Sequence, residues 1–469
     1  MKLFLCCATA LFTYSSISAA PPNILFLLAD DMRPDCIAAL GNEKIETPNL
    51  DRLVEKGMTF TRATCSYPIC VVSRSEMLTG RLGWENGVTG LRGGKFRPDL
   101  TFWAEALRDG GYETWHVGKW HVGGRPSTRG YTGIAGMFGS GGGKYWKEGQ
   151  TDWKGFPITG YRGWIFRSDD GKTHFPEMGV GVTPDISKKF ADAAVSLIEK
   201  NPDAPWFCHV NFTAPHDPLF VPPGLEGKYK NPDMPVPGNF LPVHPFDHGN
   251  FDGRDEALLA WPRTESAVQD LLRVYYSAID DMDAQIGRIL EAVEKTGELD
   301  NTIVIFTSDH GMSCGSHGLR GKQNMYEHTI NVPFIVAGPG ISRGTRTEAQ
   351  VYLRDLYPTT CDLAGMDIPA SVTASSFAPV LRGETNLHHE DIYGYFTDTQ
   401  RMVRSNEGWK LVFYPHIDRW QMFDLNSDPM EKNDLANSPQ SRHREQFNLL
   451  RDKLDSWRKE SGDPLLSKN

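Results

Sequence analysis

NILFLLADD, residues 23–31, is a continuous apolar run that ends in two aspartates. A strand buried on both faces of a sheet has this pattern, because neither of its faces has to be polar. TIVIFTSDHG, residues 302–311, has the same shape and carries Asp309 and His310 at the corresponding place. We therefore expect two buried strands, each followed by polar side chains at its carboxyl end.

Helix signals separate these strands from further apolar runs. Cap, Pro and Gly signals bound helical patterns near residues 47–57 and 101–110, and a long helical pattern covers residues 271–293. Apolar runs at 205–212 and 332–338 indicate two more strands. This alternation predicts an α/β fold with a mixed, largely parallel sheet sandwiched by helices.

The alternation weakens after about residue 370. The stretches MVRSNEGWKLVFYP and QMFDLNSDPMEKNDLA favour short antiparallel strands and a turn, followed by a terminal helix. We therefore divide the chain into a large α/β domain, residues 21–370, and a smaller C-terminal α+β domain, residues 371–469.

Two stretches are predicted to lack regular structure. Residues 123–143 contain nine glycines, too many for the interior of an element, and residues 218–262 are rich in Pro, Gly, Asp and His. The glycine-rich stretch has two interpretations, a flexible connection or a loop that borders a substrate cleft.

Residues 1–20 have the pattern of a secretory signal, with Lys2, an apolar run and small residues at the end. No later stretch approaches the roughly 18 consecutive apolar residues of a membrane helix, so we expect an exported protein without a membrane span. The net charge of -10 argues against binding to nucleic acid or an anionic membrane, which requires a broad positive field.

Cysteines are sparse in the predicted mature chain, which rules out a disulfide scaffold. Of eight in the whole sequence, six follow the signal: Cys36, Cys65, Cys70, Cys208, Cys314 and Cys361.

The aspartates at the two strand ends suggest a metal site. Taken alone, Asp30 and Asp31 could be a helix cap and a solvated neighbour. Because carboxyl ends of parallel strands meet at one edge of a sheet, however, Asp309 should join them there. Three carboxylates favour a hard divalent cation, while the nitrogen of His310 suits manganese or zinc better than calcium.

YPICVVSR, residues 67–74, indicates a helix that starts near residue 70. Cys70 and Arg74 are four residues apart and share one face of that helix. A nucleophile at a helix N-terminus beside an arginine is suited to an oxyanion. The alternative is a buried cysteine beside a surface arginine.

CVVSRSEMLTGR, residues 70–81, resembles the signature of the sulfatase family. Further matches follow in the family's order from residue 23 to about residue 437: LLADDMRPD, TPNLDRLVEKGMTFTRAT, GYETWHVGKWHVG, FTAPHDP, SDHGMSCGSHG, GKQNMYEHTINVPFIV and FDLNSDPMEKNDLA. The chain is thus similar to formylglycine-dependent sulfatases of the alkaline-phosphatase superfamily, in particular to bacterial carbohydrate sulfatases.

The resemblance implies an alkaline-phosphatase-like core and a modified cysteine. A maturation enzyme would oxidise Cys70 to formylglycine, whose hydrate supplies the nucleophilic oxygen. One Ca²⁺ would be held by Asp30, Asp31, Asp309 and His310 together with the formylglycine at position 70.

The residues that match the family's sulfate pocket are Arg74, Lys119, His121, His216 and Lys322. Arg74, Lys119 and Lys322 would stabilise the transferring sulfuryl group. Asp309 would take the proton of the attacking hydroxyl, His216 with Lys322 would protonate the leaving oxygen, and His121 would assist sulfate release. Taken singly, these residues could equally be solvated strand ends and loop charges.

A sulfated carbohydrate is the expected substrate. Polar groups suited to a sugar are Asp217, His244, His248 and the glycine-rich loop, and the aromatic rings that could stack on one are Trp115, Trp120, Trp146 and Trp164.

Two alternatives stay open. One is a phosphodiester or phosphonate hydrolase of the same superfamily. The other is a non-catalytic protein that binds sulfated glycans and never matures Cys70, because the family's proline or alanine two residues after the cysteine is Val72 here.

Overall fold

The computed structural model describes residues 20–91 and 93–468. The predicted signal, residues 1–20, therefore lies outside the described residues except for Ala20. Among the helices of this described part, none combines the length and apolar content that a membrane span requires.

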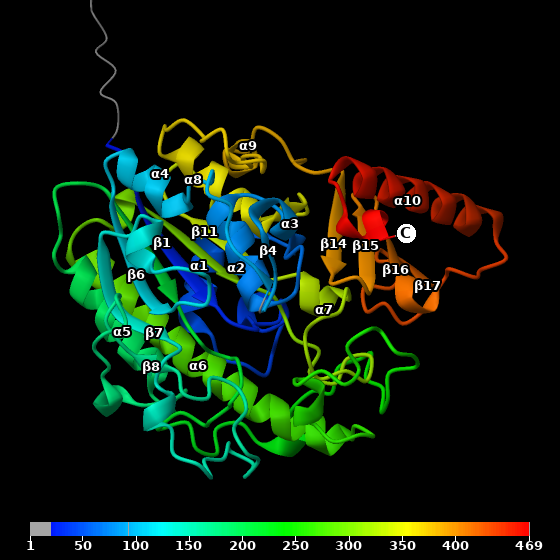
Figure 1. The fold of residues 1–469 in the computed structure, drawn as a ribbon, viewed down its shortest axis with the longest axis horizontal. Helices are drawn as coiled ribbons and strands as arrows, with labels where there is room; N and C mark the ends of the chain where they lie inside the picture. Colours follow the sequence, from blue (N-terminus) through cyan, green and yellow to red (C-terminus); the bar gives the residue numbers. More distant parts are fainter. Residues whose placement is uncertain (1–19, 92, 469) are drawn as a thin grey trace, which may run out of the picture.

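A nine-stranded mixed sheet forms the centre of the molecule, in the order β12-β2-β11-β10-β1-β9-β6-β7-β8 (Figure 1). Its middle five strands run parallel: β10 (Thr302–Ser308), β1 (Asn23–Ala29), β9 (Trp206–Asn211), β6 (Glu113–Lys119) and β7 (Gly133–Gly139). Outside them lie β11 (Phe334–Ala337) and the edge strand β8 (Ile165–Phe166), which run antiparallel to β10 and β7. Strand β2 (Gly57–Phe60) follows β11, and β12 (Thr345–Thr347) forms the other edge. The prediction of a mixed, largely parallel sheet is confirmed.

Helices cover both faces of this sheet (Figure 1). One face packs against α1 (Pro48–Lys56), α5 (Ile186–Ile198) and α6 (Glu265–Lys295). The other packs against α2 (Cys70–Thr79), α4 (Trp103–Asp109), α8 (Leu356–Leu363) and α9 (Ala378–Leu381). In β1, Leu25 and Leu27 join the first core while Phe26 and Leu28 join the second, which explains why the run has no polar face.

Short elements complete this part of the chain. They are α3 (Gly83–Asn86), α7 (Glu327–Ile330), and the two-stranded sheets formed by β3 (Ala63–Thr64) with β13 (Val351–Tyr352) and by β4 (Val88–Gly90) with β5 (Gly93–Gly94). Residues 218–262 contain only two short 3-10 helices besides irregular chain, as expected.

The prediction of a loop over residues 123–143 is wrong for residues 133–139, which form β7. A β-carbon added to Gly133 would lie 2.5 Å from Cδ1 of Trp115, and one added to Gly136 would lie 2.8 Å from the β-carbon of Ala193. These glycines let β7 pack closely against β6 and α5. Glycine normally weakens a strand, but here close packing requires the missing side chain.

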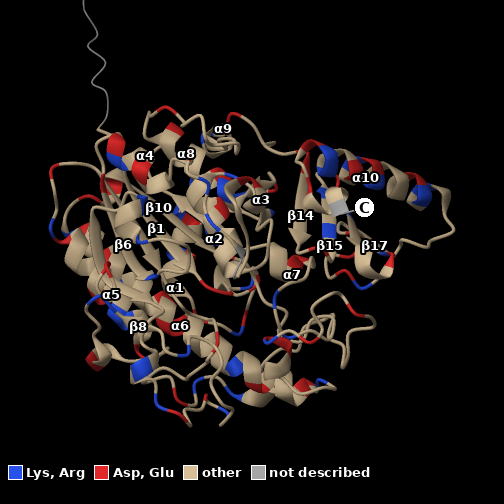
Figure 2. Cartoon of the chain, in the orientation of Figure 1, with Lys and Arg blue, Asp and Glu red and all other residues tan. Residues whose placement is uncertain are grey.

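The C-terminal part is a four-stranded antiparallel sheet covered by one helix (Figure 1). It consists of β14 (Asp391–Phe396), β15 (Gln400–Ser405), β16 (Trp409–Tyr414), β17 (Arg419–Asp424) and α10 (Ser441–Glu460), which confirms the predicted antiparallel strands and terminal helix. Phe377 and Leu381 still pack in a core of the main sheet, and the proposed boundary at residue 370 stays a prediction. Acidic and basic residues are interspersed over both parts (Figure 2).

Candidate active site

The carboxyl ends of the central strands bring the predicted site residues to one edge of the sheet. Ala29 of β1 pairs with Ser308 of β10, so Asp30 and Asp309 leave the sheet side by side. Lys119 is the last residue of β6, which is separated from β1 by β9. Open α/β sheets place their ligands at this edge.

Three buried carboxylates form the centre of the site. Oxygen atoms of Asp30, Asp31 and Asp309 lie within 4.8 Å of one another, and all three side chains are fully buried. Burial raises the pKa of Asp309 to about 7, against the lowering effect of His310. Such crowding disfavours three ionised carboxylates unless positive charge lies among them.

The donor set fits a divalent cation. Nε2 of His310 is buried and has no hydrogen-bond partner, so it is free to coordinate. Cys70, Asp31 and His310 also place ligand atoms within 4.8 Å of one another. Three carboxylates, one imidazole and the side chain at position 70 form a mostly anionic set of ligands. The choice of Ca²⁺ stays a prediction.

Three cationic side chains surround the carboxylates. Nζ of Lys119 lies 2.7 and 2.6 Å from the two oxygens of Asp30. Nζ of Lys322 lies 2.7 and 2.8 Å from those of Asp31. Arg74 connects Asp309 to Asp30, because its Nε lies 2.9 Å from a carboxylate oxygen of Asp309 and its Nη2 lies 3.3 Å from one of Asp30. Three cations thus balance three carboxylates, and a bound divalent cation would make the site attractive to an anion.

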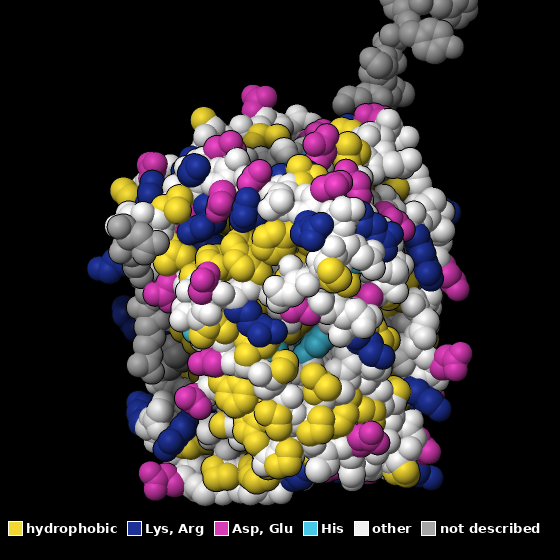
Figure 3. All heavy atoms as spheres, turned by 90° about the vertical axis from the view of Figure 1, so that its right-hand side faces the viewer, with side chains coloured by type: hydrophobic (Ala, Val, Ile, Leu, Met, Phe, Trp, Pro, Cys, Tyr) yellow, Lys and Arg dark blue, Asp and Glu magenta, His cyan; other side chains and the backbone are white. Residues whose placement is uncertain are grey.

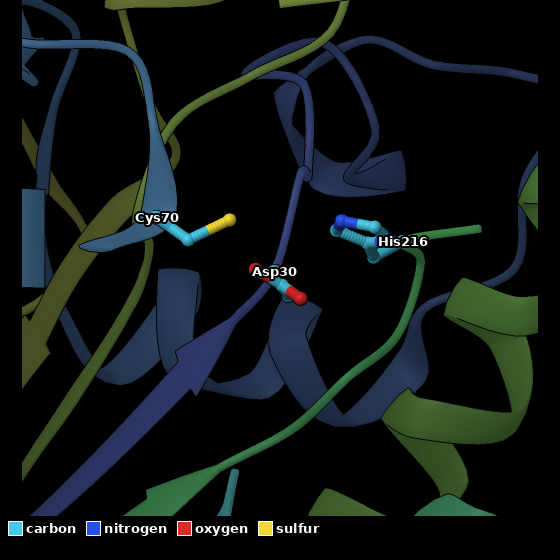
Figure 4. Close-up of side chains that lie close together, drawn as sticks. All are labelled: Asp30, Cys70 and His216. Carbon is cyan, nitrogen blue, oxygen red and sulfur yellow. The ribbon is translucent and has the colours of Figure 1, made fainter. Parts of the chain in front are cut away.

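Cys70 is the first residue of α2, as the sequence predicted, and Gly80 caps the helix after its last residue, Thr79. The hydroxyl of Ser73 donates to the carbonyl of Asp309 over 2.7 Å, which holds the start of α2 against the segment that carries Asp309 and His310. Cys70, Asp30 and His216 converge beyond the end of β1 (Figure 4). Burial alone would raise the pKa of the Cys70 thiol, but the positive charges of Lys119 and Lys322 hold this pKa well below its usual range.

A pocket of about 390 Å³ opens onto this centre. Four of the predicted catalytic residues line it, namely Cys70, His121, His216 and Lys322. Arg74 and Lys119 lie behind them, held by the carboxylates. Nε2 of His216 lies 3.7 Å from a carboxylate oxygen of Asp31. Burial alone would lower the pKa of His216, but this carboxylate raises it.

Sequence reasoning missed two residues of the centre. Asn211 accepts a 2.7 Å hydrogen bond from Arg74; because it ends β9, the rule applied to the other strand ends would have found it. Tyr161 donates its hydroxyl to Asp30. It lies in irregular chain, where no local pattern marks it.

The sugar-binding interpretation is wrong for three residues. Trp115 is stacked on Trp206 in the core, with ring centroids 5.5 Å apart. His248 is fully buried, and His244, also buried, lies 3.1 Å from the hydroxyl of Tyr326.

Two other residues with a predicted role in sugar binding contact neighbouring side chains or backbone instead. Trp146 packs over Gly181, and Asp217 pairs with Arg254. Trp120 and Trp164 do line pockets at the site. Histidine side chains are visible near the middle of the face drawn in Figure 3, with Lys and Arg side chains on either side.

Comparisons with known proteins agree with this geometry. A family model described as Sulfatase matches residues 22–366, and one described as N-sulphoglucosamine sulphohydrolase, C-terminal, matches residues 315–460. The chain is 29% identical over 457 residues to an arylsulfatase of Clostridium perfringens, covering 92% of this chain and 93% of that protein. It is 27% identical over 487 residues to an N-acetylglucosamine-6-O-sulfatase of Bacteroides thetaiotaomicron, covering 88% and 82%.

Solved structures share the fold. One, described as a complex with its substrate D-glucosamine-2-N,6-O-disulfate, superposes with a TM-score of 0.76 at 24% identity and covers 95% of this chain and 99% of that one. A phosphonate monoester hydrolase of Agrobacterium radiobacter superposes with a TM-score of 0.75 at 22% identity, covering 94% and 96%. Because both identities are low, these likenesses establish the architecture alone.

Proposed function

The chain belongs to the sulfatase family, and we propose that it hydrolyses sulfate esters of carbohydrates at a divalent cation, with formylglycine made from Cys70. The observation that carries this proposal is the position of Cys70. Cys70 is the first residue of α2 and its side chain lines an open pocket. The Sγ atom lies within 4.8 Å of ligand atoms of Asp31 and His310. A structural cysteine would instead lie among apolar side chains.

Two groups would add chemistry that this chain lacks by itself. A formylglycine hydrate at position 70 supplies a nucleophilic oxygen, and a divalent cation held by Asp30, Asp31, Asp309 and His310 withdraws charge from the sulfuryl oxygens.

The chain's own residues supply orientation and proton transfer. Lys322, whose Nζ lies 3.7 Å from Sγ of Cys70, is placed to donate to a sulfuryl oxygen. Arg74 and Lys119 hold the carboxylates in position behind it. His216, with its raised pKa, can deliver a proton from Nε2 to the leaving oxygen. Nδ1 of His121 is buried without a partner and can accept one.

The substrate class rests on the relatives. Those reported above include a sulfatase that acts on N-acetylglucosamine, and an open pocket lined by polar groups and Trp164 suits a sugar. Export directed by residues 1–20 is part of the same proposal, since extracellular glycans are its expected targets.

Val72 is fully buried in a cluster with Tyr67, Met402 and Val412. Its side chain therefore packs the start of α2 against the C-terminal sheet. This packing gives a structural reason for a larger apolar residue at a position where the family has proline or alanine.

Mass spectrometry of the tryptic peptide Ala63–Arg74, from protein made in its own host, tests the modification. We expect the mass loss that accompanies replacement of the thiol by an aldehyde, and no turnover by Cys70→Ala. An unmodified thiol throughout would instead support the non-catalytic alternative.

Rates on 4-nitrophenyl sulfate and on a matched aryl phosphate diester test the reaction. Faster sulfate hydrolysis supports the proposal, and faster diester hydrolysis would assign the chain to phosphoester chemistry.

A further inference from the structure

We propose that a second pocket beside the active site binds a second anionic group, a carboxylate or a sulfate, on the same substrate molecule. This inference rests on the proposed function and specifies its substrate class. The second pocket has a volume of about 720 Å³, and its cationic lining residues are Lys95, Arg129 and Arg167.

The two pockets adjoin one another. Leu91, His121 and Trp164 line both of them, so one ligand can extend from the first into the second. The ring of Trp164 stands edge-on to that of His121, with centroids 4.9 Å apart. A half-buried indole at this junction offers an apolar surface to a sugar ring whose substituents point into the two pockets.

The second pocket is cationic and its lining contains no Asp or Glu. Among the described residues, neither Lys95 nor Arg167 has an ion-pair partner, and Nε of Arg167 is buried without a hydrogen-bond partner. Arg129 differs, because its guanidinium lies 4.9 and 4.2 Å from the ring centroids of Phe96 and Phe102. The guanidinium of Arg167 and the ammonium of Lys95 are therefore the groups available to an anion.

Glycines make room for these guanidinium groups. A β-carbon on Gly139 would lie 3.1 Å from Nε of Arg167, and one on Gly171 would lie 2.6 Å from its Nη1. A β-carbon on Gly124 would lie 2.9 Å from Nη2 of Arg129. Of the two interpretations of the glycine-rich stretch, the structure thus favours a wall of the cleft, since Gly123, Gly124 and Ser140 line this pocket.

Charge then selects the substrate. A guanidinium binds carboxylate or sulfate through paired hydrogen bonds, and a pocket without carboxylates disfavours a sulfate ester that carries a cation. An anionic sugar bearing the scissile sulfate together with a uronate or a second sulfate satisfies both pockets.

A matched pair of fluorogenic esters tests the inference. The esters are 4-methylumbelliferyl sulfate and 7-sulfooxycoumarin-4-acetate, whose leaving groups share the 7-hydroxycoumarin core and differ by one carboxylate. We expect about tenfold higher kcat/KM on the carboxylate ester, expressed mainly in KM, because one charge-assisted contact is gained. Sulfated uronate disaccharides, compared with their carboxyl-reduced forms and with forms lacking the second sulfate, show which anion is preferred.

Variants locate the effect. Arg167→Gln and Lys95→Gln should each reduce the preference for the carboxylate ester toward unity, while Arg167→Lys should retain part of it. Arg444→Gln, at an exposed residue of α10, is the control and should keep the full preference. A thermal melt of each variant checks that it is folded.

The outcomes separate the two proposals. Equal kcat/KM on both members of every pair, or a preference that survives both substitutions, overturns the second-anion pocket alone. Absence of turnover on all the sulfate esters overturns the proposed function and this inference with it.

Discussion

A buried ion cluster connects the C-terminal sheet to the active-site segment. Glu327, the first residue of α7, accepts hydrogen bonds from Nη1 of Arg404 over 2.6 Å and from Nζ of Lys410 over 2.9 Å. Side chains of these two cations are only 1% and 0% exposed. Because α7 follows the segment that carries Asp309 and Lys322, we expect Glu327→Gln to destabilise the fold next to the proposed metal site.

Two estimates of the free energy of unfolding that Glu327→Gln would lose agree. Removing one partner of a buried ion pair costs about 3–5 kcal/mol, and the lower end applies because Lys410 keeps Glu431 at 2.7 Å. Burial opposes ionisation of Glu327, yet Arg404 and Lys410 lower its pKa from 4.5 to about 2, which corresponds to about 3 kcal/mol. For about 450 residues, an unfolding entropy of about 2.1 cal/mol/K per residue converts this into a Tm shift of about 3 °C.

Urea denaturation and calorimetry at pH 7 measure the loss. The matched control is Glu291→Gln, which removes an exposed ion pair to Lys295 whose side chains are 60% and 68% exposed, and should change stability by less than about 1 kcal/mol.

The pH dependence gives a second test. Because the folded pKa of Glu327 lies below the unfolded value, its contribution is present above about pH 4.5 and is lost as the pH falls toward 2. The difference between wild type and Glu327→Gln should therefore shrink over that range. The reasoning would be refuted if Glu327→Gln lost no more stability at pH 7 than Glu291→Gln, or if the stability difference between wild type and Glu327→Gln were independent of pH.

Three further perturbations address the site and the sheet. Asp309→Asn should lower the divalent metal bound per chain, as measured by atomic emission after dialysis, and unchanged metal content would contradict the assigned ligand set. Lys119→Met leaves the Asp30 carboxylate without its ammonium partner and should reduce kcat on 4-nitrophenyl sulfate by about 10²–10³. A loss below about tenfold would contradict the role of Lys119 in holding Asp30. Gly133→Ala places a β-carbon 2.5 Å from Cδ1 of Trp115 and should cost about 1–3 kcal/mol in urea denaturation. Gly143→Ala, with open space around the added β-carbon, is the control, and equal losses would refute the packing argument.

Strand ends were the most predictable part of the site. Apolar runs identified β1 and β10, and parallel pairing then required Asp30 and Asp309 to meet at one edge. Cys70 and Arg74 were predictable because four residues make one helical turn. His310 followed from the same strand-end rule, although its free Nε2 is visible only in the structure.

Contacts between segments distant in the sequence could not be predicted from it. Tyr161 reaches Asp30 from irregular chain, and no local pattern carries that information. The glycines of β7 were misinterpreted because glycine frequency reports conformational freedom, whereas their spacing to Trp115 and α5 depends on packing.

The sequence alone determined the α/β class, the antiparallel C-terminal part and the residue types of the proposed metal and nucleophile site, because periodicity and strand ends are local properties. Only the tertiary structure decided which cations pair with which carboxylates and which arginines remain unpaired. It also decided whether a glycine-rich stretch borders the cleft. These features depend on distances between segments that are separated in the sequence, by 44 residues for Arg74 and Asp30 and by 291 for Lys322 and Asp31, and packing sets those distances.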